Sequence, residues 1–256
     1  MRAPAILAAL MVAAACAAAS AATPDYARET RWASEVAPQI VVGDVVWLDL
    51  RGRPRVLALY AEPAGPAKAA VVVVHGLGVH PDWNLIGEVR TRLADRGYAT
   101  LAVQMPVLAA DAPRDAYRDV SGDAGDRLAA AVAWLRAKGH ARIAIVSHSL
   151  GASMADAYLA RADAAPIAAW VPIGMMAAFT RPPREPVLDV VAERDFPEAL
   201  AAAKLRGPQL PRDGCSGART IAGADHYMTG AAAPLDDAVA GFLDLVVNGR
   251  CEALAK

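Results

Sequence analysis

The chain has 256 residues, of which 55% are hydrophobic and 21% charged, and its formal net charge is −1. This length suits one globular domain or at most two small ones, and the composition supplies enough apolar side chains for a large core. The near-neutral charge argues against a basic surface for nucleic acid and against a polybasic stretch for anionic lipid. We therefore expect a small or neutral molecule as the substrate and no nucleic-acid partner.

The first residues have the composition of an export signal. A positively charged start precedes an apolar run from Ala3 to Cys16, and small residues at positions 19–21 fit a cleavage site. We predict a signal peptide over residues 1–22, an exported protein (periplasmic or secreted) and no stable membrane insertion after cleavage. An uncleaved membrane anchor is one alternative, although alanine is only weakly hydrophobic. Lipid modification of Cys16 is another, although no leucine stands where a lipobox usually has one.

Two cysteines, Cys215 and Cys251, remain after such a cleavage. An even pair in an oxidising compartment indicates a disulfide, and two unpaired buried thiols are the alternative. No cysteine or histidine cluster has the spacing of metal ligands, so we predict no metal and no cofactor.

Strand-like and helical segments alternate along the chain. The predicted strands are 41–42, 45–48, 55–60, 70–74, 98–105, 142–146, 167–173, 187–191 and 218–221, and the predicted helices are 85–96, 121–138, 150–161, 197–205 and 234–247. Gly43-Asp44 is a hairpin signal, so the first three strands are expected to be antiparallel. We predict an N-terminal extension over 23–40 and one α/β domain over 41–256, with a mostly parallel sheet flanked by helices. The carboxyl ends of its strands should form the ligand site.

The residues Ser147 to Gly151 follow a predicted buried strand and precede a predicted helix. An S-x-S-x-G sequence at such a junction is typical of a nucleophile elbow, a strained turn that presents the Ser149 hydroxyl above the sheet edge. Ser147 stands where the usual motif has glycine. A purely structural turn is the alternative reading.

With this turn, the chain from about Val41 onward resembles the α/β-hydrolase family. The strand 70–74 runs into His75-Gly76-Leu77-Gly78, which is similar to the oxyanion segment of that family. The resemblance implies that the backbone N–H groups of Leu77 and Leu150 bind the developing oxyanion, and losing one such donor typically costs ~3–4 kcal/mol. It also implies that His75 is structural and is hydrogen-bonded beneath the loop.

The same resemblance implies a base and an orienting acid. In this fold the order along the chain is serine, acid, histidine, and His226 is the only one of the five histidines that follows Ser149. The family pattern G-E-x-D after the strand 187–191 places the acid at Asp195, although Ala192 replaces the usual glycine. Glu193 is the alternative acid.

The segment HGLGxHPDW, residues 75–83, resembles that of a poorly characterised bacterial subgroup of this family. We expect His80 and Asp82 to cap the following helix, with Trp83 packed beneath it, and we do not expect them to be catalytic. Only residues 174–186 separate two predicted strands where many relatives insert a cap. We therefore predict no large cap domain and an open pocket.

Together these residues predict a carboxylesterase-like serine hydrolase that acts on a small-molecule ester through an acyl-enzyme on Ser149. A non-catalytic binding member of the fold is one alternative. A peptidase or amidase is another, because a triad does not determine the leaving group.

Overall fold

The structure is a computed structural model, and it describes residues 22–251. Except for Ala22, the predicted signal peptide lies outside the described residues, and so does the alternative lipidation site Cys16. Within residues 22–251, no helix is both long and apolar enough to cross a membrane.

In the described part of the chain, eight strands form one sheet in the order β1-β2-β4-β3-β5-β6-β7-β8. The strands are β1 (Asp44–Leu50), β2 (Arg53–Ala61), β3 (Ala70–Val74), β4 (Ala99–Val103), β5 (Ile143–His148), β6 (Ala169–Ile173), β7 (Leu188–Arg194) and β8 (Gly217–Asp225). β1 pairs antiparallel with β2 and β2 antiparallel with β4, whereas every later pair is parallel. The predicted α/β fold with a mostly parallel sheet is confirmed.

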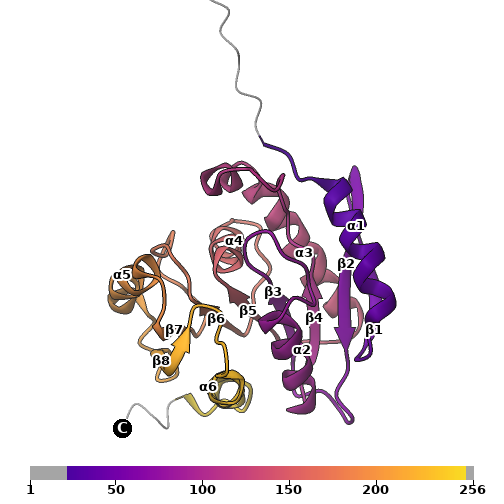
Figure 1. Cartoon of the computed structure of the whole chain (residues 1–256). Coiled ribbons are helices and arrows are strands. Elements are labelled where there is room, and N and C mark those ends of the chain that lie inside the picture. The colour runs from indigo at the N-terminus through magenta and orange to yellow at the C-terminus, as the bar shows by residue number, and fades with distance from the viewer. Residues whose placement is uncertain (1–21, 252–256) are drawn as a thin grey trace, which may run out of the picture.

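Helices cover both faces of the sheet. They are α1 (Tyr26–Val36), α2 (Leu85–Asp95), α3 (Ser121–Ala137), α4 (Leu150–Leu159), α5 (Pro197–Arg206) and α6 (Ala232–Val247). Figure 1 shows α3 and α4 above the sheet and α2 and α6 below it. Successive side chains of a strand point to opposite faces, so Val72 and Val74 of β3 pack with α3 and α4, while Val71 and Val73 pack with α2 and α6. Burial on both faces explains the continuous valine run of β3.

The first hairpin differs from its prediction. Val41 and Val42 form no strand and are exposed, β1 begins at Asp44, and the turn lies at residues 51–52 between β1 and β2. The glycine at position 43 has another role: a Cβ atom there would lie 2.1 Å from the carbonyl oxygen of Tyr60. Gly43 therefore allows a close approach of two backbone segments, which a turn signal in the sequence does not distinguish from a hairpin.

The predicted extension 23–40 contains a helix, α1, that the sequence analysis did not anticipate. Asp25 caps it by accepting the backbone N–H of Arg28 at 2.9 Å. The buried Glu29 carboxylate pairs with the buried Arg127 of α3 at 2.9 Å. Burial raises the pKa of Glu29, although Arg127 opposes that rise. The ion pair and the burial of Ala33 hold α1 against the main domain.

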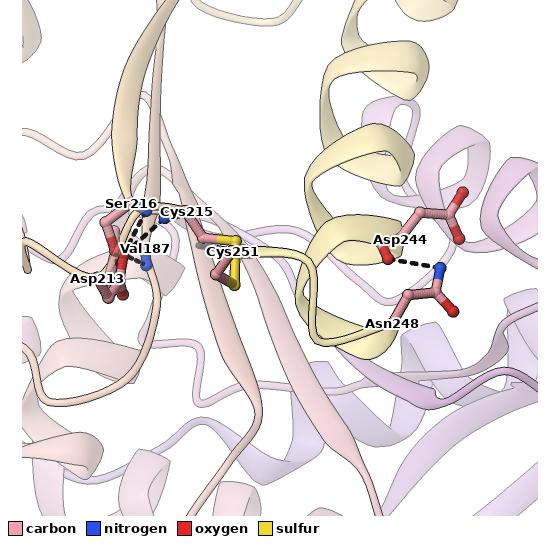
Figure 2. Close-up of a disulfide and its surroundings, with 7 residues drawn as sticks. All are labelled: Val187, Asp213, Cys215, Ser216, Asp244, Asn248 and Cys251. Carbon is pink, nitrogen blue, oxygen red and sulfur yellow. Dashed lines mark hydrogen bonds between the residues drawn. A yellow bond between two sulfur atoms is a disulfide. The ribbon is translucent and has the colours of Figure 1, made fainter. Parts of the chain in front are cut away.

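A disulfide joins Cys215 to Cys251, as predicted. Figure 2 shows that it connects the loop before β8 to the segment that leaves α6. Asp213 organises this loop, because its carboxylate accepts the N–H groups of Cys215 and Ser216 at 2.9 and 2.6 Å. The Ser216 hydroxyl in turn accepts the N–H of Val187, the residue before β7, at 2.8 Å.

Candidate active site

Ser149 occupies the turn between β5 and α4, with φ 55° and ψ −121°. A positive φ is costly for a residue with a side chain, and such strain is concentrated at functional sites. The Ser149 N–H donates to the carbonyl of Ile173, the last residue of β6, at 2.8 Å. The turn is therefore anchored to the neighbouring strand, and its geometry is that of a nucleophile elbow.

The small residues on either side of Ser149 are required by packing. A Cβ atom on Gly151 would lie 2.2 Å from the carbonyl oxygen of His75, which is far inside van der Waals contact. Ser147 is buried, and its hydroxyl accepts the indole N–H of Trp170 at 2.9 Å. This hydrogen bond explains why serine stands here instead of the usual glycine, and nothing in the local sequence indicates it.

Ser149, His226 and Asp195 lie in line at the carboxyl ends of β5, β8 and β7. The Ser149 hydroxyl is 3.0 Å from Nε2 of His226, and Nδ1 of the same ring is 2.6 Å from Oδ1 of Asp195. The exposed fractions of the three residues are 6%, 3% and 6%. Glu193 lies elsewhere, because its carboxylate accepts the N–H of Gly223 at the surface.

The surroundings of Asp195 determine the tautomer of the histidine. Burial by itself raises the pKa of the Asp195 carboxyl. The hydrogen bonds from His226 and from the backbone N–H groups of Ala192 and Phe196 outweigh burial and hold that pKa below its usual range. An ionised carboxylate only accepts hydrogen bonds, so the ring proton lies on Nδ1 and Nε2 is free to accept from Ser149. This arrangement can remove a proton from the serine hydroxyl.

Two further histidines are buried around the turn. His75 is buried at the end of β3, as expected for a structural histidine, and its Nε2 accepts the N–H of Met105 at 2.8 Å. Burial lowers the pKa of His75 to about 3. His148 donates from Nε2 to the backbone carbonyl of His226 at 2.9 Å, and burial lowers its pKa to about 4. Both rings are therefore neutral near pH 7 and support the turn and the histidine loop.

A pocket of about 200 Å³ opens beside Ser149. Its apolar and aromatic lining residues are Leu77, Val79, Trp83, Met176, Phe196 and Tyr227. The Phe196 ring stacks on the imidazole of His226 at a centroid distance of 4.3 Å. Sequence reasoning missed Phe196 and Tyr227, although each directly follows a residue that it had singled out. Met176 lines the pocket, whereas Met175 is fully buried in the core.

Of the two expected oxyanion donors, Leu77 lines this pocket and Leu150 directly follows Ser149. Leu150 is the first residue of α4 and Leu77 follows β3 by three positions, with a side chain that is 45% exposed. Within residues 22–251, neither backbone N–H donates a hydrogen bond to another backbone carbonyl in a turn or loop. An N–H at the start of a helix is also favoured toward anions by the helix dipole. Both N–H groups can therefore donate hydrogen bonds to an oxygen that develops negative charge.

A sequence profile of the alpha/beta hydrolase family matches residues 71–253. The chain belongs to the alpha/beta hydrolase family. A second profile, described as a protein of unknown function (DUF3530), matches residues 3–124 of this hydrolase. No curated protein matches it in sequence.

Several solved structures share the fold of this hydrolase. Est1E from Butyrivibrio proteoclasticus is 16% identical, with a TM-score of 0.61 over 80% of this chain and 99% of that one. XC6422 from Xanthomonas campestris, described as a serine hydrolase without a lid, is 16% identical, with a TM-score of 0.63 over 80% and 95%. A dienelactone hydrolase from Anabaena variabilis is 20% identical, with a TM-score of 0.60 over 77% and 94%.

The His80-Pro81-Asp82-Trp83 segment of the hydrolase does not cap α2, contrary to expectation. The N-cap position is Asn84, which makes no side-chain cap hydrogen bond, and the Asp82 carboxylate instead pairs with Arg90 at 2.6 Å. His80 packs edge-on against Trp32 of α1 at 5.8 Å. Trp83 contacts Tyr227 and lines the pocket, so it does not pack beneath α2. A short loop brings these residues to three different partners, which helix-cap preferences alone do not reveal.

The loop between β6 and β7 carries no cap domain. Residues 174–186 contain neither a helix nor a strand. Phe179 of this loop is buried against Trp170, and the Thr180 N–H donates to Asp156 of α4 at 2.8 Å. Within the described part of the chain, no group of three or more His, Cys, Asp or Glu side chains could hold a metal ion.

Proposed function

We propose that this α/β hydrolase is a serine hydrolase that cleaves carboxylic esters through an acyl-enzyme on Ser149. One observation carries the proposal: a buried line of hydrogen bonds runs from the Ser149 hydroxyl to Nε2 of His226 at 3.0 Å and from Nδ1 to Asp195 at 2.6 Å. A serine is a weak nucleophile unless a base is in hydrogen-bond contact with it, and a base needs an acid that fixes its tautomer.

In the proposed reaction, His226 accepts the Ser149 proton while Oγ attacks the ester carbonyl carbon. The C=O electron pair moves onto oxygen, and the N–H groups of Leu77 and Leu150 donate to this oxyanion. His226 then gives its proton to the departing alcohol as the C–O bond breaks. Water then attacks the acyl carbonyl carbon while His226 accepts one of its protons. As the bond between the acyl carbon and Oγ breaks, His226 returns this proton to Oγ, which releases the acid and restores the free serine. Asp195 stabilises the imidazolium in both steps.

We also propose that the protein is exported and loses residues 1–22. The disulfide between Cys215 and Cys251 supports this, because disulfides persist mainly in oxidising compartments. We further propose that the chain belongs to the bacterial subgroup with the HGLGxHPDW segment, on the resemblance of residues 75–83.

The test combines covalent labelling with turnover. A fluorophosphonate should label the intact protein, and Ser149→Ala should abolish both the label and the hydrolysis of p-nitrophenyl esters. His226→Ala should lower kcat by several orders of magnitude, and the double variant should lose little more, because the two residues act as a unit. Absence of labelling would indicate a non-catalytic member of the fold. Faster cleavage of matched p-nitroanilides would indicate an amidase.

A further inference from the structure

A second and larger cavity adjoins the pocket beside Ser149. Its volume is about 460 Å³, against about 200 Å³ for the pocket. Arg114 and Met176 line both cavities, so the two spaces meet at these side chains. Leu150, which carries one of the proposed oxyanion donors, lines the larger cavity too. An ester bound at Ser149 can therefore extend past Arg114 into the larger cavity.

Arg114 is oriented at this junction without being neutralised. It begins the short 3-10 helix η2 (Arg114–Arg118), and its guanidinium donates to the sulfur of Met176 at 3.0 Å. A thioether is a weak, uncharged acceptor, so the contact directs the guanidinium but leaves its charge in place. Among residues 22–251, the ion pair of this helix joins Arg118 to Asp115 at 3.6 Å and leaves Arg114 without a carboxylate partner.

Within the described chain, Arg114 is also the one permanently charged side chain that lines the Ser149 pocket. The rest of the lining consists of apolar and aromatic residues, Gly76, Ser149 and two histidines. An arginine presents several N–H donors in a planar fork that fits a carboxylate in a bidentate manner. Arg114 itself is exposed, so it attracts an anion as a charge near a protein surface does, more strongly than in bulk water and less strongly than in a protein interior.

The other charges of the larger cavity restrict where an anion would bind. Asp115 and Arg118 pair with each other and largely cancel. Glu198, in the first turn of α5, lines the larger cavity but not the Ser149 pocket, so it opposes an anion that reaches deeper. The favourable position is therefore at the junction, beside Arg114 and close to the reacting carbonyl.

We propose that Arg114 determines specificity by binding a carboxylate that the ester substrate carries near its scissile bond. This inference rests on the proposed ester hydrolysis at Ser149 and names the substrate class of that site. The net charge of the chain, −1, does not oppose it, because the charge that lines the pocket acts at short range whereas distant surface charges are screened. The carboxylate can belong to the acyl part or to the alcohol part of the ester, and the experiment separates the two.

The test compares matched esters that differ by one carboxylate. On the acyl side, p-nitrophenyl hexanoate is paired with the mono-p-nitrophenyl ester of adipic acid, in which a carboxylate replaces the terminal methyl group, with shorter and longer diacids alongside. On the alcohol side, phenyl butyrate is paired with 4-carboxyphenyl butyrate. Values of kcat/KM are measured for the wild type, Arg114→Gln, Arg114→Lys and the control Arg118→Gln, which alters an arginine that lines only the larger cavity.

We expect the wild type to prefer the charged member of one pair, and Arg114→Gln to lower that preference about fivefold, the upper range for an ion pair between exposed groups. Arg114→Lys should retain part of the preference, because it keeps the charge but not the fork. Arg118→Gln should retain nearly all of it, because Arg118 and the Asp115 that it leaves unpaired are 84% and 83% exposed and are screened by solvent. Added salt should weaken the preference.

Two results would overturn the inference: no preference for either charged ester in the wild type, or an equal loss on charged and neutral esters in Arg114→Gln. A failure of the proposed function is distinguishable, because the neutral esters would then not be hydrolysed and a fluorophosphonate would not label Ser149.

Discussion

Replacing Asp195 with asparagine tests the proposed base most directly. The carboxylate accepts three hydrogen bonds: Oδ2 accepts from Ala192 at 3.1 Å, and Oδ1 accepts from Phe196 at 2.8 Å and from the ring of His226 at 2.6 Å. An asparagine has one oxygen and one NH₂ group, so it cannot accept at both positions.

Each orientation of the new amide places a donor against a donor. With the oxygen in the Oδ2 position, the NH₂ group faces the N–H of Phe196 and forces the proton of His226 onto Nε2, where it no longer accepts from Ser149. With the oxygen in the Oδ1 position, the NH₂ group faces the N–H of Ala192. Leaving such a buried donor unpaired costs about 1–3 kcal/mol. The first orientation loses the correct tautomer of His226, which lowers kcat by about 10⁴-fold in a serine protease, so we expect a loss of up to that order here.

The assay is kcat/KM on any p-nitrophenyl ester that the wild type cleaves, with a thermal melt for each variant. Glu193→Gln is the matched control. Among residues 22–251, Glu193 accepts only the N–H of Gly223 at the surface, and a glutamine oxygen can do the same. It should change the rate by no more than about twofold, as a surface substitution does. A mild effect of Asp195→Asn together with a severe effect of Glu193→Gln would refute this reasoning.

Three further predictions concern the disulfide, the buried histidines and the open pocket. The bond between Cys215 and Cys251 closes a loop with a sequence separation of 36 residues, so Cys251→Ala should lower the free energy of unfolding by about 4 kcal/mol. Urea titration against the non-reduced wild type measures this change, and unchanged stability would contradict the prediction. Burial lowers the pKa of His75 from 6.5 to about 3, so below pH 6.5 the folded protein binds fewer protons at this residue than the unfolded chain does. The stability that neutral His75 contributes is therefore complete above pH 6.5 and is lost as the pH falls toward 3. This loss is about 2 kcal/mol at pH 5, and the melting temperature of His75→Asn should fall less between pH 7 and pH 5 than that of the wild type. Since residues 174–186 form no cap, activity on long-chain esters should not rise sharply above the micellar threshold, and such a rise would show interfacial activation.

The local pattern of the sequence was sufficient for most of the fold. The fully buried strand β3 is an uninterrupted apolar run, and a glycine follows α3 at position 139 where the predicted helix ends. The elbow around Ser149 was recognisable because its strained turn requires small residues two positions before and two positions after the serine, and these residues can be read from the sequence. His226 followed from the order of residues along the chain. Each of these features depends on residues that are close in sequence or unique in the chain.

Only the tertiary structure decided the features that depend on contacts between distant segments. The hairpin signal at Gly43 marks a close approach to Tyr60, which lies on β2. The choice of Asp195 over Glu193 depends on which carboxylate faces a ring that is 31 residues further along the chain. The position of Arg114 between two cavities depends on the sheet bringing η2 and the loop after β6 together. Periodicity and motifs depend on residues that are close together in the sequence. Burial, ion pairing and cavity shape depend on residues from distant segments, which come into contact only when the chain folds.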